Sequence, residues 1–422
     1  MPTPQIVQKL LVAAETTFGI DLTGSLASFR PVPFMEGSAS WAPNQDTHNP
    51  LQALQAQLDY QKEILGKKHW EMSFNLPFAP TGVAAAAGTP APSNSALDLI
   101  LRTCMGGVFR GEGSVVATGG WASAGGGDVA DASGFRAGGI AGMVHNGQLH
   151  LRPIKQVSGD TLSVKPRFPA APSQGAAIVS GATYFWTSDP QGSLQFAVQG
   201  ENPEDRWVLM GGQGTFTPEL ALDGSIQSLN FTFTGVDWER AEDAAGTASL
   251  FNTALTQATY LSHEPIVGHQ GECLIRTNGN IALTGAVAHI SSIAFEGGLQ
   301  YQQIPSPSGV QGVLRHRLIR PPGQAPVSGT FQTFYESNSR QKDKEARRDL
   351  AVFYRNGTSA GHAVAMEAPT VQYVNVQRED LDNIAGSTVE WRGRADRDVV
   401  IPSAATADAI AMASSPWRLH TA

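Results

Sequence analysis

Residues 214–235 read GTFTPELALDGSIQSLNFTFTG, and this stretch decides the fold class. Apolar and polar residues alternate over 225–234, as they do in a strand with one buried face, and Phe231 and Phe233 fall on the same side. Asp223 and Gly224 separate this run from another strand-like run over 214–222. Because Asp-Gly between two alternating runs is a strong hairpin signal, we expect an antiparallel β-hairpin here.

The same kind of pattern extends through most of the chain. Alternating or apolar runs bounded by Gly, Asn, Asp and Pro predict strands at 68–76, 147–151, 161–165, 183–186, 193–199, 206–211, 291–304, 310–319, 329–335, 350–354, 362–366, 370–378 and 386–396. Helical periodicity predicts helices at about 4–17, 50–66, 96–104 and 339–349. The chain is therefore expected to be mainly β, with a β-sandwich or β-barrel-like core.

Two segments differ from this pattern. The first 65 residues combine two predicted helices with a Pro- and Ser-rich stretch over 24–49, and we interpret 1–65 as a helical N-terminal arm. Residues 106–142 hold repeated Gly pairs and triplets with little apolar content. Such a composition favours a long flexible loop over a core element.

The second half of the chain repeats the order of the first. In each half a helix precedes an aromatic strand, a long polar strand (214–222 and 370–378) and a closing strand that ends on Gly and Asp. We interpret this as a duplicated unit of strands with one short helix. The expected organisation is an arm over 1–65, a first module over 66–245, a second module over 246–402 and a C-terminal tail over 403–422.

Composition narrows the class of protein. Charged residues make up 16% of the chain, against a typical value of ~25% in soluble domains. A surface with so little charge fits a protein that covers much of itself with neighbouring copies, although a low-charge secreted enzyme has the same composition. The formal charge of −8 is not suited to holding nucleic acid by phosphate neutralisation.

Motifs for chemistry are missing from the sequence. It contains no Walker loop, no Gly-x-Ser-x-Gly elbow and no His-Glu-x-x-His zinc helix, and its two cysteines, Cys104 and Cys273, form no metal or redox motif. No stretch approaches the ~18 apolar residues of a membrane span. We expect a non-enzyme with no cofactor or metal and no membrane segment. Two alternatives remain, because they depend on residues that only the fold brings together: a carboxylate pair for glycoside hydrolysis, and a surface of aromatic side chains that binds sugar.

Several segments together resemble the tail tube proteins of long, non-contractile-tailed bacteriophages. They are residues 66–74, the helix at 96–104, and the strand pair from Gly214 to Phe216 and from Leu229 to Gly235. The length suggests a tandem two-module version. The resemblance implies a virion protein that is assembled in the host cytoplasm and builds stacked rings around a channel for DNA ejection.

The resemblance also implies partners and alternatives. The main partner would be the chain itself, with trimeric rings favoured if six modules close a ring. Tape measure, tail terminator and distal tail proteins would be further partners, and genomic DNA would pass without specific binding. The alternatives are another virion structural protein, such as a decoration or distal tail protein, or an extracellular polysaccharide-binding β-sandwich.

A channel for DNA should present polar and acidic side chains. One side of each long polar strand would face the lumen, because side chains alternate across a strand. The candidate lumen-lining residues are Thr215, Thr217, Glu219, Asp223, Gln372, Gln377, Glu379, Asp380 and Asp382.

Overall fold

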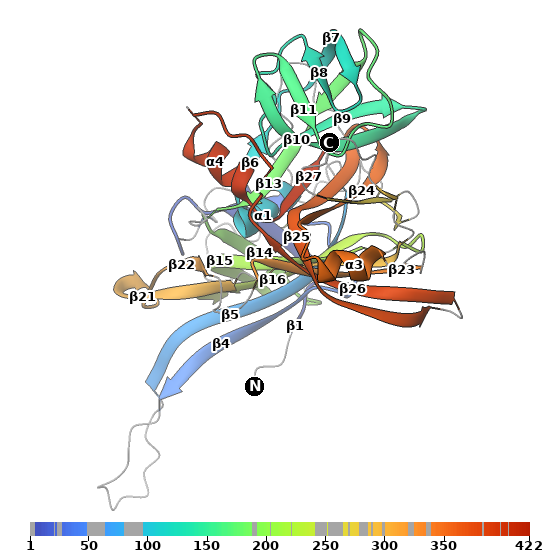
Figure 1. Ribbon diagram of the computed structural model, residues 1–422. Helices are drawn as coiled ribbons and strands as arrows, with labels where there is room; N and C mark the ends of the chain where they lie inside the picture. The colour runs from blue at the N-terminus through green and yellow to red at the C-terminus, as the bar shows by residue number, and fades with distance from the viewer. Residues whose placement is uncertain are drawn as a thin grey trace, which may run out of the picture.

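The structure is a computed structural model of the 422-residue chain (Figure 1). It describes residues 5–20, 22, 28–48, 64–79, 96–187, 192–202, 204–220, 222–240, 251, 265–268, 271–277, 286–287, 290–297, 300–319, 325–334, 339–381, 384–396, 398–403 and 405–422. Strands dominate these residues, which confirms the mainly β prediction.

The first sheet has nine strands within the described residues. They are hydrogen-bonded in the order β1-β4-β5-β16-β15-β14-β2-β3, with β17 also paired to β15. Their bounds are β1 Gln5–Ile6, β2 Lys9–Ala14, β3 Arg30–Pro31, β4 Ser40–His48, β5 Ile64–Pro77, β14 Leu194–Gln199, β15 Arg206–Glu219, β16 Ser228–Gly235 and β17 Asp237–Arg240. The hairpin predicted around Asp223-Gly224 is confirmed as β15–β16, in register from Gln213↔Thr234 to Glu219↔Ser228.

The second sheet has ten strands within the same described part of the chain. Seven follow the order β19-β18-β24-β25-β26-β23-β20, and β6, β13 and β27 join through β25. Their bounds are β6 Gly106–Arg110, β13 Ala182–Trp186, β18 Glu272–Thr277, β19 Ala286–Val287, β20 Ile290–Gly297, β23 Val327–Phe334, β24 Leu350–Ser359, β25 His362–Leu381, β26 Ile384–Arg394 and β27 Arg418–Thr421. A separate hairpin consists of β21 Gln300–Val310 and β22 Val313–Ile319.

A small closed barrel stands above the two sheets in Figure 1. Its strands, in barrel order, are β10 Gln148–Ser158, β11 Thr161–Val164, β8 Gly126–Val129, β7 Ser114–Ser123, β12 Ala177–Ser180 and β9 Ile140–His145. The chain enters and leaves this barrel at one place, where the Gly111 N–H donates to the Gly181 carbonyl at 3.0 Å.

The flexible loop predicted over 106–142 is wrong, because these residues form β6, β7, β8 and the start of β9. The glycines serve close packing instead of flexibility. A Cβ on Gly127, for example, would overlap the indole of Trp121, which is buried in the barrel core. A glycine in a strand often marks such a close approach, and composition alone does not distinguish it from a loop glycine.

The helical arm predicted over 1–65 is also wrong where the structure describes it. Residues 9–14 form β2, which bonds β14 on one edge and β3 on the other. Leu10, Leu11, Val12 and Ala13 are all buried, and such a run on a doubly covered strand mimics the apolar face of a helix. The stretch 24–49 contains β4, with Trp41 in the core. The helix predicted over 50–66 lies mostly outside the described residues, and its end begins β5.

The C-terminal tail predicted over 403–422 is wrong as well. It forms helix α4 (Ala407–Ser414), capped by Thr406, and then β27, which bonds β13 and β25. Two other helices were predicted at the right places: α1 covers Ala96–Met105 and α3 covers Ser339–Glu345.

One large core lies between the sheets. It joins Trp70 and Phe74 of β5 to Phe295 of β20, Trp391 of β26 and Trp417 before β27. Aromatic contacts connect the parts, such as Phe216 to Trp417 with ring centroids 5.2 Å apart. Aromatic pairs of this kind are worth ~0.5–1.5 kcal/mol beyond the area they bury. The two sheets are therefore packed as one body.

Candidate functional site

Strict alternation gives β5, β16 and the second half of β15 one apolar and one polar side. On β16, Leu229, Phe231 and Phe233 are buried while the residues between them point away from the core. The neighbouring strands alternate in the same way. We name the outward residues of β5, β16 and β15 the first polar face: Glu71, Ser73, Asn75, Asn230, Thr232, Thr234, Thr215, Thr217 and Glu219.

Register aligns this face in cross-strand rows. Thr217 pairs with Asn230, which pairs with Asn75. A second row runs through Thr215, Thr232, Ser73 and Ser40. The predicted residues Thr215, Thr217 and Glu219 therefore share one face with hydroxyl and amide side chains that sequence reasoning did not single out.

Glu219 ends the face next to its hairpin turn. The Ser228 hydroxyl donates to its carboxylate at 2.9 Å. Asp223 lies in the turn itself and is exposed. Hydrogen bonds from the Ser225 backbone N–H and hydroxyl lower the pKa of Asp223, so both carboxylates stand at one end of the first polar face as acceptors.

The second sheet has a matching polar side. We name its outward residues the second polar face: Glu296 on β20; Ser328, Thr330 and Gln332 on β23; Thr388, Glu390 and Arg392 on β26; and Gln372, Asn375, Gln377 and Glu379 on β25. One row runs from Gln377 through Thr388 and Gln332 to Ser292. Glu379 accepts a hydrogen bond from the Thr388 hydroxyl at 2.5 Å.

The other predicted residues of this sheet have different surroundings. The Gln372 side chain donates to Asp349 at 2.8 Å and to the Arg347 carbonyl at 3.2 Å, so it is tied to the segment after α3. Asp380 is exposed near the end of β25. Asp382 lies outside the described residues.

Both faces are mostly uncharged, and their charges are mainly acidic. Glu71 and Glu219 stand on the first face, and Glu296, Glu379 and Glu390 stand on the second with Arg392. Lys67 and Arg394 lie at the strand ends, where they bond Gln303 and Asp349. Such a surface offers hydrogen-bonding groups to water and little attraction for phosphate.

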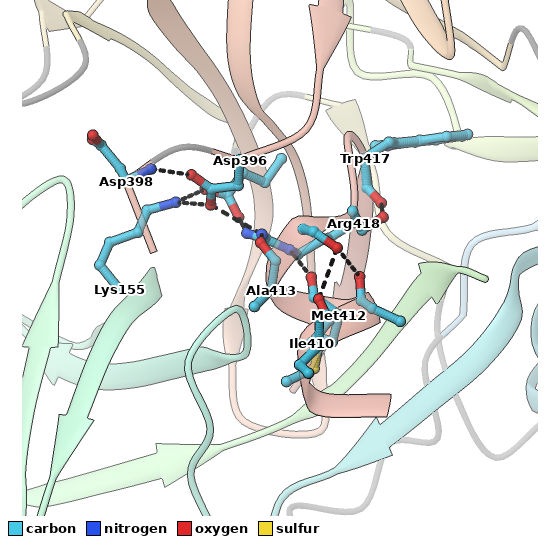
Figure 2. A network of polar contacts seen from close by, with 12 residues as sticks. Lys155, Asp396, Asp398, Ile410, Met412, Ala413, Trp417 and Arg418 are labelled. Carbon is cyan, nitrogen blue, oxygen red and sulfur yellow. Dashed lines mark hydrogen bonds and ion pairs between the residues drawn. The ribbon is translucent and has the colours of Figure 1, made fainter. Parts of the chain in front are cut away.

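A buried charge cluster, which sequence reasoning did not anticipate, lies beneath the barrel. Lys155 of β10 donates to Glu367 of β25 at 2.7 Å and to Asp396 at 2.8 Å. Arg418 of β27 bonds the same two carboxylates at 2.7 and 2.9 Å. Figure 2 shows Lys155 and Arg418 converging on Asp396 from different elements. The cluster therefore fixes the barrel to the second sheet and to the C-terminal strand.

Burial alone would raise the pKa of Glu367 and Asp396, but Lys155 and Arg418 outweigh it and lower both values. His420, which is buried beside Glu367, has its pKa lowered, chiefly by burial. The carboxylates are therefore ionised at neutral pH and the imidazole is neutral, and the four remaining charges balance.

A second cluster fixes the barrel at another point. Glu272 of β18 bonds Arg152 of β10 at 3.2 Å and Arg355 of β24 at 2.6 Å. His150 lies beside them, and burial, followed by repulsion from the two arginines, lowers its pKa to about 4. These ion pairs join residues that are distant in the sequence, so they could be identified only once the structure placed β10 beside β18, β24 and β25.

The part of the chain that the structure describes holds neither a metal-ligand cluster nor a membrane-spanning helix. No group of three or more His, Cys, Asp or Glu side chains there is placed to hold a metal ion. No helix among these residues has the length and apolar character needed to cross a membrane.

Comparison with known proteins gives no family for this chain. No family model and no curated protein matches it. A solved structure of K. pneumonia MrkH in its apo state aligns over 60% of this chain and 77% of that chain, with 7% identity and a TM-score of 0.11. A likeness at that level carries no argument about fold or function.

Proposed function

We propose that this protein is a structural subunit that assembles with copies of itself into stacked rings, forming the tail tube of a long-tailed bacteriophage. The observation that carries the proposal is a repeated topology. Strands β4-β5-β16-β15-β14-β2 of the first sheet and β20-β23-β26-β25-β24-β18 of the second have the same order when each set is numbered along the chain. A helix stands at the same place in both sets, with α1 against β15 and α3 against β25.

Registers support a duplication at the level of single residues. The β14–β15 ladder shifts register between Leu194 and Phe196, and the β24–β25 ladder shifts between Leu350 and Val352. When the two ladders are aligned at these shifts, Leu194 corresponds to Leu350 and Phe196 corresponds to Val352. Because a β-bulge is a specific local feature, its recurrence at one position favours descent of both units from one ancestor.

The alignment also matches the two polar faces. On the closing hairpins, Phe216 pairs with Phe231 and Val376 pairs with Val389, which makes Thr217 the counterpart of Gln377. The next outward residue is a glutamate in both units, Glu219 and Glu379, and each accepts a hydroxyl hydrogen bond from the neighbouring strand. Two units with equivalent polar, acidic faces fit the lining of a channel.

Ring closure follows from the two units per chain. A head-to-tail interface that closes generates a ring, and stacked rings generate a filament. If six units complete a ring, three chains supply them, so we propose trimeric rings. Tape measure, terminator and distal tail proteins would bind the ends, and DNA would pass through a lumen that does not hold phosphate.

Electron microscopy of the purified full-length chain, together with its mass in solution, tests the proposal. We expect rings or tubes with three chains per ring. Six identical chains per ring would contradict the trimer. Discrete small oligomers without a channel would favour another virion structural protein, and monomers at high concentration would favour the polysaccharide-binding alternative.

A further inference from the structure

A cavity of about 310 Å³ lies between the barrel and helix α4. The loop from β8 to β9 and strand β10 form its barrel side, and α4 with the turn before it forms the other side. The apolar side chains on its walls include Phe135, Ala137, Val157, Ala405, Ala409 and Ala413. None of these residues belongs to the polar faces or to the buried charge clusters described above.

Small side chains on α4 account for the space. Ala409 and Ala413 are four residues apart, so they lie on the same side of the helix, and each ends at a methyl group. The helix still reaches the barrel loop at one point, because a Cβ on Gly138 would be 3.1 Å from the Cα of Ala413. Away from that contact, alanine is too short to fill the gap between helix and barrel.

Polar contacts hold both ends of the helical side in place. Arg418 donates to the carbonyls of Met412 at 2.8 Å and Ala413 at 2.6 Å, which fixes the end of α4 (Figure 2). The N–H of Val400 donates to the Lys155 carbonyl at 3.0 Å, which ties the segment before α4 to β10. Because both segments are fixed, the helix does not move inwards to close the space, and the cavity is part of the fold.

The cavity wall carries one charged side chain among the residues that the structure describes, Arg136. Its guanidinium stacks over the Phe109 ring, 4.6 Å from the centroid, and makes no ion pair with a described residue. The other polar side chain on the wall is Thr406, whose oxygen accepts from the Ala409 N–H at 3.3 Å. The hydroxyl proton of Thr406 therefore remains available to an acceptor. Both polar groups are donors, so an anion is the ligand that complements them.

Large apolar side chains are exposed beside the cavity. Ile401 lines it and is 38% exposed, and on α4 Ile410 follows Ala409 and is 47% exposed. Exposed apolar surface of this kind often marks a binding site. A ligand with an apolar body would remove part of this surface from water, which favours its binding.

We propose that this cavity binds the alkyl chain of a monocarboxylate, with the carboxylate at Arg136 and Thr406. An apolar cavity of ~150 Å³ accepts benzene, so about twice that volume suits a ligand of roughly ten to twelve non-hydrogen atoms, such as octanoate or decanoate. A peptide fits less well, because each of its residues brings an N–H and a carbonyl, and the described walls offer few polar side chains to pair with them. The inference does not depend on the proposed assembly into rings.

Isothermal titration calorimetry of the full-length protein with octanoate, octanol and octylamine tests the charge requirement. We expect octanoate to bind about threefold to tenfold more tightly than octanol, since an exposed cation contributes less than a buried one. Octylamine, whose ammonium group would meet Arg136, should bind most weakly. Arg136→Gln should remove the preference for octanoate, whereas Arg348→Gln, which removes an exposed cation elsewhere, should keep it.

Two substitutions on α4 test the location. Ala409→Leu fills part of the cavity and should weaken octanoate binding at least about tenfold, because the added carbons compete for the same volume. Ala407→Leu places the same side chain on the exposed start of the helix and should leave binding unchanged, with circular dichroism as the check on folding. A photoreactive octanoate analogue with a diazirine on its chain needs no substitution. Mapped by mass spectrometry on the wild-type protein, it should label residues 135–137 or 401–413.

The inference is overturned if wild-type protein binds octanol as tightly as octanoate, or if folded Ala409→Leu binds octanoate as well as wild type does. Labelling confined to other segments, or no binding at millimolar octanoate, would overturn it too. Tighter binding of acetyl-Leu-Leu, which ends in a carboxylate, would show a peptide site instead. Because each assay works on single or assembled chains, these outcomes are independent of ring formation.

Discussion

The charge cluster beneath the barrel makes a sharp prediction about stability. Replacing Lys155 with Met keeps an unbranched side chain that is one heavy atom shorter, and removes the charge. Glu367 and Asp396 then face Arg418 alone, and the buried cluster changes from neutral to a net charge of −1. Removing one partner of a buried ion pair costs about 3–5 kcal/mol, because the remaining charge is left without compensation.

The assay is urea unfolding of the Lys155→Met variant, followed by tryptophan fluorescence and circular dichroism. We expect the free energy of unfolding to fall by about 3–5 kcal/mol. Arg348→Ala is the control: Arg348 bonds Asp343 at 3.0 Å, but its side chain is 56% exposed. Exposed pairs contribute ~0–1 kcal/mol, so the control should change little.

A double variant separates charge balance from packing. In Lys155→Met/Asp396→Asn the cluster is neutral again, with Glu367 paired to Arg418. We expect the double variant to lose less unfolding free energy than the two single variants lose together. The difference, which is the coupling energy, should be about 0.5–3 kcal/mol. The reasoning is refuted if Lys155→Met costs less than about 1 kcal/mol, below the range for a broken buried pair. Strictly additive losses would contradict the charge-balance account.

Three further predictions concern packing, pH and charge. Gly235→Ala should destabilise the protein by about 1–3 kcal/mol in urea unfolding, because its Cβ would overlap a buried indole, whereas Gly297→Ala, with 3.2 Å to the nearest atom, should cost less. The folded-state pKa of His150 is about 4, below the unfolded value of ~6.5, so the free energy of unfolding falls as pH drops from 6.5 to 4. His150→Gln should reduce this fall, as measured by unfolding midpoints across the same pH range. Glu219→Lys/Glu379→Lys assemblies should gain DNA binding that weakens with salt in a filter assay, and wild-type assemblies that bind DNA below micromolar concentration would contradict an acidic lumen.

Sequence reasoning was most successful where one face of a strand is buried. The alternation around Phe231 and Phe233 predicted β16 and its hairpin, and it placed Thr215, Thr217 and Glu219 on one face. Apolar residues that alternate with period two indicate a strand with one buried side, so the pattern predicts both the strand and which of its side chains face the core. The duplication expected from the long polar strands stays a prediction, which the matching strand orders of the two sheets support.

The failures share a physical cause. β2 is covered on both faces, and a short apolar run of that kind has no period that distinguishes strand from helix. The barrel glycines were read as flexible because their role depends on side chains distant in sequence, such as Trp121 over Gly127. Lys155 and Glu367 are 212 residues apart, and pairing over that distance is fixed by topology alone.

The barrel leaves and rejoins the rest of the chain through neighbouring glycines, Gly111 and Gly181. A foreign domain whose own ends lie close together could be grafted between them without stretching the sheets. Such a graft must replace the cations that the barrel contributes to the two buried charge clusters, Arg152 and Lys155, or neutralise the carboxylates they meet. In the proposed assembly, every copy would then carry the passenger at one fixed position, so this junction would be a regular display site.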